Sequence, residues 1–143
     1  MRRNHYLILG FGLLLLILGL VAVVGEGGGL REREVVFWGE GDKWSAQIKE
    51  EWTRVAAGGR EAGRTRVRRV FCYKGDDPES IGEVEYYLTG EKGTGSGIYK
   101  PDEEGKIVLP VIEGSFAAAE KTDTWTLVLR WDEGEEVIHL KAR

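Results

Sequence analysis

The sequence predicts an all-β fold, an antiparallel Ig-like β-sandwich of about seven or eight strands, preceded by one N-terminal transmembrane helix. Three observations indicate this: an uncharged apolar run near the N-terminus, short segments of alternating apolar and polar residues after residue 35, and turn-forming clusters of Gly, Asp and Pro between them. Many short antiparallel strands with regular turns are typical of a sandwich. An open barrel is the alternative.

The first element is the apolar run from Tyr6 to Val24, which contains no charged residue and no proline. As a helix of roughly 1.5 Å per residue it spans about 28 Å, close to the ~30 Å hydrocarbon core of a bilayer. Arg2 and Arg3 precede it, which by the positive-inside rule leaves the N-terminus in the cytoplasm. We therefore expect residues 1–25 to be a signal-anchor in the cell membrane, with the rest of the chain extracytoplasmic. A cleaved signal peptide, giving a secreted protein, is the alternative.

A glycine-rich stretch, "GEGGG", follows the apolar run and leads into the alternating charges of "RERE". Such composition is typical of a flexible linker. We expect residues 26–34 to be this linker and residues 35–143 to be the folded domain.

The first predicted hairpin lies in "VVFWGEGDKW", where Gly39 to Asp42 form a turn between two apolar segments. After it, Trp44, Ala46 and Ile48 alternate with polar residues, the period of a half-buried strand. We expect Trp38 and Trp44 to face the core. An exposed aromatic pair that stacks on a sugar is the alternative.

The middle of the chain predicts three further strands, at Thr65–Tyr73, around Val84–Leu88 and at Lys106–Ile112. Pro110 cannot donate to a central ladder, so the third is an edge strand or is broken there. The segment "GEKGTGSG" matches no phosphate-binding motif and favours a mobile hairpin loop. "GSFAAAEKTD" favours about one turn of helix.

The end of the chain predicts a β-hairpin. In "TWTLVLRW" the apolar and polar residues alternate, "DEGE" turns the chain with Gly134 available for a positive φ, and "EVIHLKA" returns. We expect His139 on the outer face of the last strand.

Composition excludes several function classes. The formal net charge is −4, which argues against nucleic-acid binding. The two histidines and the single Cys72 cannot form a His/Cys metal site, and no nucleophile motif is present. The acidic stretches match no Ca²⁺-loop spacing and indicate solvated turns. We therefore expect no enzyme activity, no metal and no cofactor, and we expect Cys72 to be buried.

The segment "GGREAGRTRVRR" concentrates positive charge in an acidic domain, with one acid, Glu61, among its arginines. The planar guanidinium suits phosphate and carboxylate groups, so an exposed set could bind anionic lipid headgroups or wall polymers. Pairing of these arginines with nearby acidic turns is the alternative. The candidate binding residues are Arg60, Arg64, Arg66, Arg68 and Arg69.

Three segments, "FWGEGDKW", "GTGSGIYKPDEEGKI" and "TWTLVLRWDEGEEVIHLKAR", carry a resemblance that extends over nearly all of residues 35–143. Together they resemble small membrane-anchored extracytoplasmic proteins of Gram-positive bacteria, with their F-x-G-E-x-x-x-W start, G-S-G segment with D-x-x-G, and closing hairpin. The resemblance implies an anchored β-sandwich and supplies no catalytic residue.

The sequence thus predicts a membrane-anchored, extracytoplasmic, non-enzymatic domain that binds a protein partner or an anionic envelope component through the arginine segment. The alternative function is a small-molecule or carbohydrate-binding module that uses an exposed Trp38 or Trp44.

Overall fold

The computed structural model describes residues 32–57 and 60–143. The predicted anchor at residues 1–25 lies outside the described residues. Within those ranges, no helix is both long enough and apolar enough to cross a bilayer.

The described part of the chain forms nine antiparallel strands and one short 3₁₀ helix. β1 starts inside the segment predicted as linker. In chain order the elements are β1 (Glu32–Glu40), β2 (Trp44–Ala57), β3 (Arg60–Tyr73), η1 (Pro78–Ile81), β4 (Val84–Gly90), β5 (Gly93–Tyr99), β6 (Lys106–Val108), β7 (Ile112–Gly114), β8 (Thr124–Trp131) and β9 (Gly134–Ala142).

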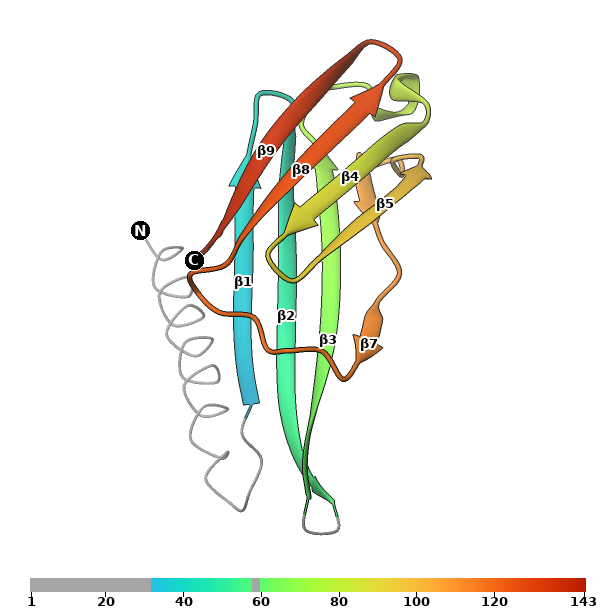
Figure 1. Cartoon of the computed structure of the whole chain (residues 1–143). Coiled ribbons are helices and arrows are strands. Elements are labelled where there is room, and N and C mark those ends of the chain that lie inside the picture. Colours follow the sequence, from blue (N-terminus) through green and yellow to red (C-terminus); the bar gives the residue numbers. More distant parts are fainter. Residues whose placement is uncertain (1–31, 58–59) are drawn as a thin grey trace, which may run out of the picture.

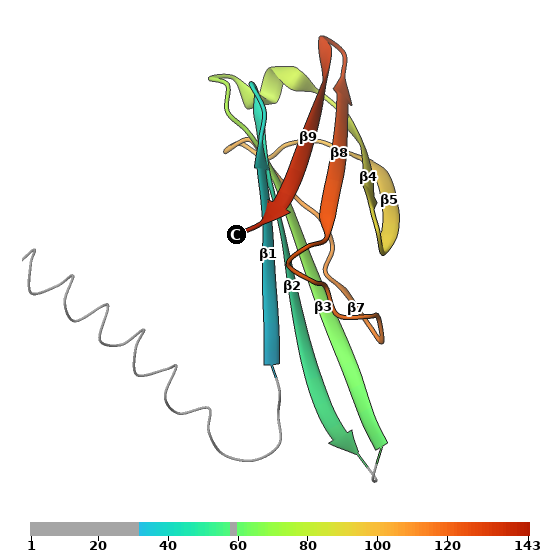
Figure 2. The same ribbon diagram turned by 60° about the vertical axis from the view of Figure 1, so that its left-hand side comes forward.

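All nine strands belong to one hydrogen-bonded sheet in the order β5-β4-β8-β9-β1-β2-β3-β6, with β7 also paired to β3. The sheet bends sharply between β9 and β1, which are joined at only two residue pairs, so that β4, β5, β8 and β9 face β1 to β3 (Figures 1 and 2). The antiparallel all-β prediction is confirmed. The strands form a nearly closed, barrel-like sheet, the arrangement of the open-barrel alternative. Within the described residues, the outer edge of β5 and the outer edges of β6 and β7 pair with no further strand.

The core fills the end of the molecule where the two halves of the sheet lie against each other. Period-two alternation sends every second side chain inward, and the ring of Trp44 packs against Tyr73 and Trp131 at centroid distances of 5.2 and 6.0 Å. The fully buried apolar residues are Phe37, Trp44, Ile48, Phe71, Val84, Leu127, Leu129, Ile138 and Leu140.

The prediction for the two tryptophans is right for Trp44 and wrong for Trp38. Trp44 is fully buried. Because Phe37 faces the core, its neighbour Trp38 points to the opposite face, where it is half-buried beneath the guanidinium of Arg143, 4.4 Å from the ring centroid. The buried ring of Trp44 offers no face to a sugar.

The predicted turn between β1 and β2 is confirmed. The Glu136 carboxylate on β9 accepts hydrogen bonds from the backbone N–H groups of Lys43 and Trp44, at 2.9 and 3.1 Å. This carboxylate lies where a side chain at Gly41 would stand, so a larger residue at that position would displace Glu136 from the turn.

The C-terminal hairpin also forms as predicted, with Trp131 paired to Gly134. The link is only Asp132–Glu133, and Gly134 is a strand residue without positive φ, contrary to the expectation. His139 is exposed on the outer face, as predicted, and contacts Thr126 across the hairpin.

Two expectations for irregular segments are wrong. The glycine-rich "GEKGTGSG" is not a mobile loop, because all but its first three residues belong to β5, in a two-residue hairpin with β4. Residues 115–123 form no helix; they cross the inner face of β1 to β3 as an irregular segment, which we call the strap (Figure 1).

The segment around Pro110 is broken as predicted. β6 ends at Val108 and β7 begins at Ile112, and both pair with β3 at the edge of the sheet. Cys72 points to the outer face of β3 and is half-buried, in contrast to the buried position expected for it.

Candidate functional site

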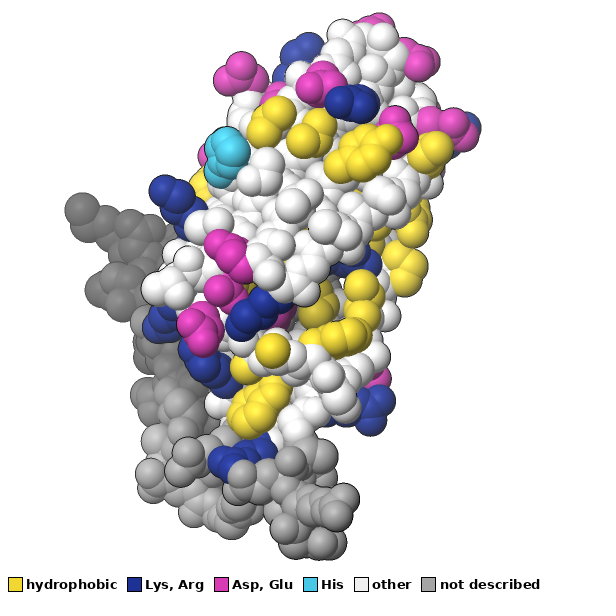
Figure 3. Space-filling model, viewed as in Figure 1, with side chains coloured by type: hydrophobic (Ala, Val, Ile, Leu, Met, Phe, Trp, Pro, Cys, Tyr) yellow, Lys and Arg dark blue, Asp and Glu magenta, His cyan; other side chains and the backbone are white. Residues whose placement is uncertain are grey.

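A cleft of about 530 Å³ opens on the inner face of the sheet, between the β4–β5 hairpin and the strap (Figure 3). Its size falls within the roughly 300–1,000 Å³ typical of small-molecule sites. The described residues that line it are mostly apolar. They are Ile48, Glu50, Thr65, Val67, Arg69, Leu88, Lys92, Gly93, Thr94, Gly95, Ile112, Phe116, Ala117 and Trp125.

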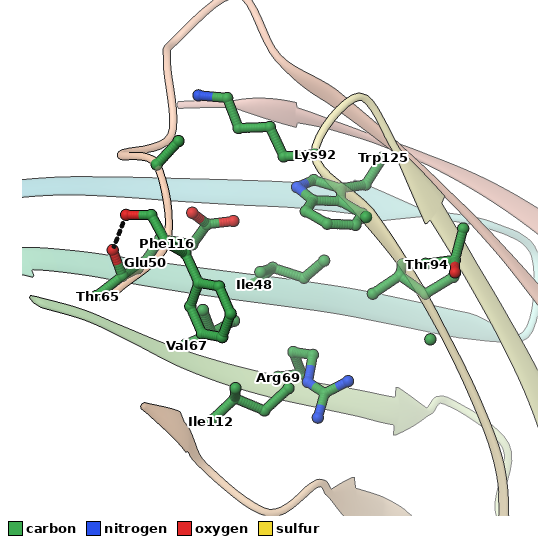
Figure 4. Close-up of a pocket in the computed structure, with 14 residues that line it drawn as sticks. Ile48, Glu50, Thr65, Val67, Arg69, Lys92, Thr94, Ile112, Phe116 and Trp125 are labelled. Carbon is green, nitrogen blue, oxygen red and sulfur yellow. Dashed lines mark hydrogen bonds between the residues drawn. The ribbon is translucent and has the colours of Figure 1, made fainter. Parts of the chain in front are cut away.

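Unequal strand lengths create the space. β2 and β3 have 14 residues each, whereas β4 and β8, which face them, have 7 and 8. The shorter strands cover only one end of β2 and β3. Beyond that cover, the inner side chains of β2 and β3 form the floor of the cleft (Figure 4).

The free edge strand β5 keeps the cleft open because its inward positions are glycines. Gly93 and Gly95 pair with Gly90 and Leu88 and face inward, while Thr94 between them faces outward with Thr89. A Cβ atom at Gly93 would meet nothing within 4 Å, and one at Gly95 would lie 3.4 Å from Arg69 Nη1. The absence of these side chains leaves room above the guanidinium.

The strap closes the opposite side of the cleft and is tied to both of its neighbours. Thr65, 1% exposed on β3, donates its hydroxyl hydrogen to the Phe116 carbonyl at 3.1 Å. Lys92, in the turn between β4 and β5, donates to the Ala118 carbonyl and pairs with Asp123 at 3.2 Å. The strap and the β4–β5 turn therefore form one connected rim.

Arg69 places a buried cation at one end of the cleft. The residue is only 8% exposed. Its Nη2 donates a long hydrogen bond of 3.4 Å to the Pro110 carbonyl, and its buried Nε has no hydrogen-bond partner. A buried guanidinium donor without an acceptor is costly, which marks this group as one that can bind an acceptor entering the cleft.

Glu50 places a buried acid at the other end. It is 8% exposed, and its carboxylate takes part in no hydrogen bond or ion pair within the described ranges. Burial raises the pKa of Glu50 above its ordinary value, Lys92 lowers it in part, and the charge of Asp123 raises it. Lys92 itself is paired with Asp123, so Glu50 has no cation of its own.

Trp125 adds a third polar atom to the cleft wall. Its ring lies against Gly90, where any side chain would collide with it, and its buried indole Nε1 has no hydrogen-bond acceptor. Trp44 Nε1 is unpartnered as well, but it lies in the closed core beside Tyr73 and Trp131, away from the cleft.

The structure divides the predicted arginine set between two faces. Arg64, Arg66 and Arg68 lie on the exposed outer face of β3, while Arg69 points into the cleft. Arg64 and Arg66 share one partner, Glu113, at 3.0 and 3.4 Å. Arg60 begins β3, and its side chain lies outside the described part of the chain.

The acids of the described residues do not gather into a metal site; no group of three or more His, Cys, Asp or Glu side chains converges there. Some of them stabilise turns. The Asp102 carboxylate accepts the backbone N–H groups of Glu104 and Lys106 at 2.9 and 2.8 Å, in the turn where Gly105 has a φ of 82°.

The cleft includes residues that the sequence reasoning missed, chiefly Glu50, Trp125 and the β5 glycines. A signal for them exists. The strand-like alternation of Gly93, Gly95 and Gly97 with Thr94 and Ser96 indicates a strand with one bare face. The fold and cleft define a β-sheet domain with an internal, partly charged cavity. No protein-family model, no curated protein and no solved structure matches the chain.

Proposed function

We propose that this protein is a non-catalytic binding domain that takes a small organic molecule into the cleft. We also propose that residues 1–25 anchor the protein in the cell membrane, with the binding domain on the extracytoplasmic side. The single observation that carries the binding role is the cleft itself: an apolar cavity of about 530 Å³ that contains two buried, unpaired charged groups, on Glu50 and Arg69. A mostly apolar pocket with a few convergent polar groups is the usual form of a ligand site.

The chemistry of the lining supports binding over catalysis. No histidine, serine or cysteine is among the described residues that line the cleft. The hydroxyl of Thr65, near the one carboxylate on Glu50, donates to the Phe116 carbonyl, and Lys92 is engaged by Asp123 and the strap. The extracytoplasmic location rests on the apolar run after Arg2 and Arg3 and on the resemblance described above.

The outer arginine face is a second candidate site, for an anionic envelope polymer or lipid headgroup, since Arg64, Arg66 and Arg68 do share one exposed face. Glu113 neutralises part of that charge. Reversing all three arginines to Glu should release the full chain, kept in mild detergent, from an immobilised anionic polymer such as polyphosphate at low salt. Retention of the variant at both low and high salt would remove this candidate.

The cleft is tested with 2-naphthoate, an apolar bicyclic acid small enough to enter it. We expect 2-naphthoate to bind the full chain in mild detergent by isothermal titration calorimetry, with a blank titration into detergent alone. Gly93→Phe places a ring in the open space of the cleft and should abolish binding, because a Cβ at Gly93 meets no neighbour. The matched control, Ser96→Phe, carries the same ring on the outer face, where Ser96 pairs with the exposed Tyr87, and should bind as the wild type does.

Absence of binding to the wild type, or equal binding by Gly93→Phe and the wild type, would contradict the proposed function.

A further inference from the structure

Glu50 and Arg69 are neighbours that do not pair. Glu50 is registered opposite Val67, and Arg69 is two residues further along β3, so the two occupy diagonal positions on one face of adjacent strands. Diagonal Cα atoms in such a ladder are about 7–8 Å apart, a distance that an arginine side chain can cover. The guanidinium instead bonds the Pro110 carbonyl, and Arg69 is absent from the charges that affect Glu50.

Two buried opposite charges within reach of each other normally form a pair, because each is costly to bury alone. Here both side chains are more than nine-tenths buried and both line the cleft (Figure 4). Ile48, which pairs with Arg69 across β2 and β3, lies on the floor of the cleft beside them. Arg69 has a free donor at Nε, and the Glu50 carboxylate has free acceptor positions. The cleft therefore offers a cationic end and an anionic end, separated by apolar side chains.

We propose that the ligand is a small zwitterion with an apolar body, whose carboxylate binds Arg69 and whose ammonium group binds Glu50. This inference rests on the proposed function, since it names the class of molecule that the cleft takes. The apolar body contacts Ile48, Val67 and Phe116. Each charged group of the ligand completes a hydrogen-bonded ion pair that the empty cleft lacks, and these charge-assisted bonds are the strong ones.

The two ends also account for the glycines of β5. A side chain at Gly95 would stand 3.4 Å from Arg69 Nη1, at the place where a carboxylate reaches the guanidinium. Glycine there leaves the approach open. Outward Thr94 and Ser96 have no such constraint.

A matched set of three para-substituted benzenes tests the inference: 4-(aminomethyl)benzoate carries both charges, 4-methylbenzoate only the carboxylate, and 4-methylbenzylammonium only the ammonium. Each is titrated into the full chain in mild detergent. We expect the zwitterion to bind roughly tenfold or more tightly than either singly charged compound, because a hydrogen bond to a charged group contributes about 1.5–3 kcal/mol, and 1.4 kcal/mol is tenfold.

Substitutions then assign each charge to its end. Glu50→Gln should bring the zwitterion to the affinity of 4-methylbenzoate and leave 4-methylbenzoate unchanged. Arg69→Met should weaken both carboxylates. The matched controls are Glu51→Gln and Arg68→Met, which alter adjacent residues on the outer face and should change none of the affinities.

Equal affinities for the zwitterion and 4-methylbenzoate would overturn the inference, as would an unchanged preference in Glu50→Gln. The 2-naphthoate titration separates this failure from failure of the proposed function. If 2-naphthoate binds the wild type and Gly93→Phe prevents it, the cleft is a binding site whatever the three benzenes show.

Discussion

Replacing Arg69 by methionine should stabilise the ligand-free domain. The unpartnered, buried guanidinium nitrogen costs about 1–3 kcal/mol, and the long 3.4 Å bond to Pro110 O returns at most about 1 kcal/mol. Methionine fills the space of the arginine stem without a donor. We therefore expect Arg69→Met to raise the free energy of unfolding by about 1–2 kcal/mol, a rise in Tm of roughly 4–8 °C per kcal/mol in a domain of this size.

Urea unfolding of the full chain in non-denaturing detergent, followed by tryptophan fluorescence, measures this difference. The control is Arg68→Met, which alters the exposed neighbour on the outer face and should change stability by no more than about 0.5 kcal/mol. The sign of the change in unfolding free energy tells whether Arg69 pairs with Glu50 in the ligand-free protein. If Arg69 paired with Glu50 in the free protein, its removal would leave a buried carboxylate alone and cost about 3–5 kcal/mol. Clear destabilisation would therefore refute the reasoning.

Two further predictions concern stability. Because burial raises the pKa of Glu50, the folded state holds that proton more tightly than the unfolded chain, and the contribution of Glu50 to stability is lost as pH rises above its ordinary 4.5. Urea unfolding at pH 4 and at pH 7.5 should therefore show that Glu50→Gln becomes more stable relative to the wild type as the pH rises. Glu51→Gln should become less stable relative to the wild type over the same range, because the hydrogen bond from Lys49 lowers the pKa of Glu51. The same difference in unfolding free energy between Glu50→Gln and the wild type at both pH values would contradict the raised pKa of Glu50. Phe71→Ala should cost about 3–5 kcal/mol, against about 0.5 kcal/mol or less for the exposed Val108→Ala; similar losses for both would place the core elsewhere.

The strands could be predicted because each depends on a local pattern. Alternation identified the inner faces of β2, β4 and the C-terminal hairpin, and Pro110 marked the break between β6 and β7. The same rule assigns Arg69 to the face opposite Arg68 and sends Trp38 away from the core.

The cleft could not be predicted in the same way, because it arises from contacts between distant segments. It exists where β4 and β8 end before β2 and β3 do, and where the strap crosses the inner face. No local pattern indicates that the strap carbonyl of Phe116 meets Thr65. Glycine lowers strand propensity, so the composition of β5 favours a loop, although the placement of its glycines on one face of the strand is itself a structural signal.

The most direct test of the central claim is methyl NMR of the full chain with isoleucine and valine labels, during titration with 2-naphthoate. The account predicts that the methyl signals of Ile48 and Val67, on the floor of the cleft, shift in proportion to occupancy. Those of Val108 and Val137, exposed on the outer face, should stay in place. Shifts confined to Val108 and Val137, or no shift at Ile48 and Val67, would contradict the claim that the inner cleft is the binding site.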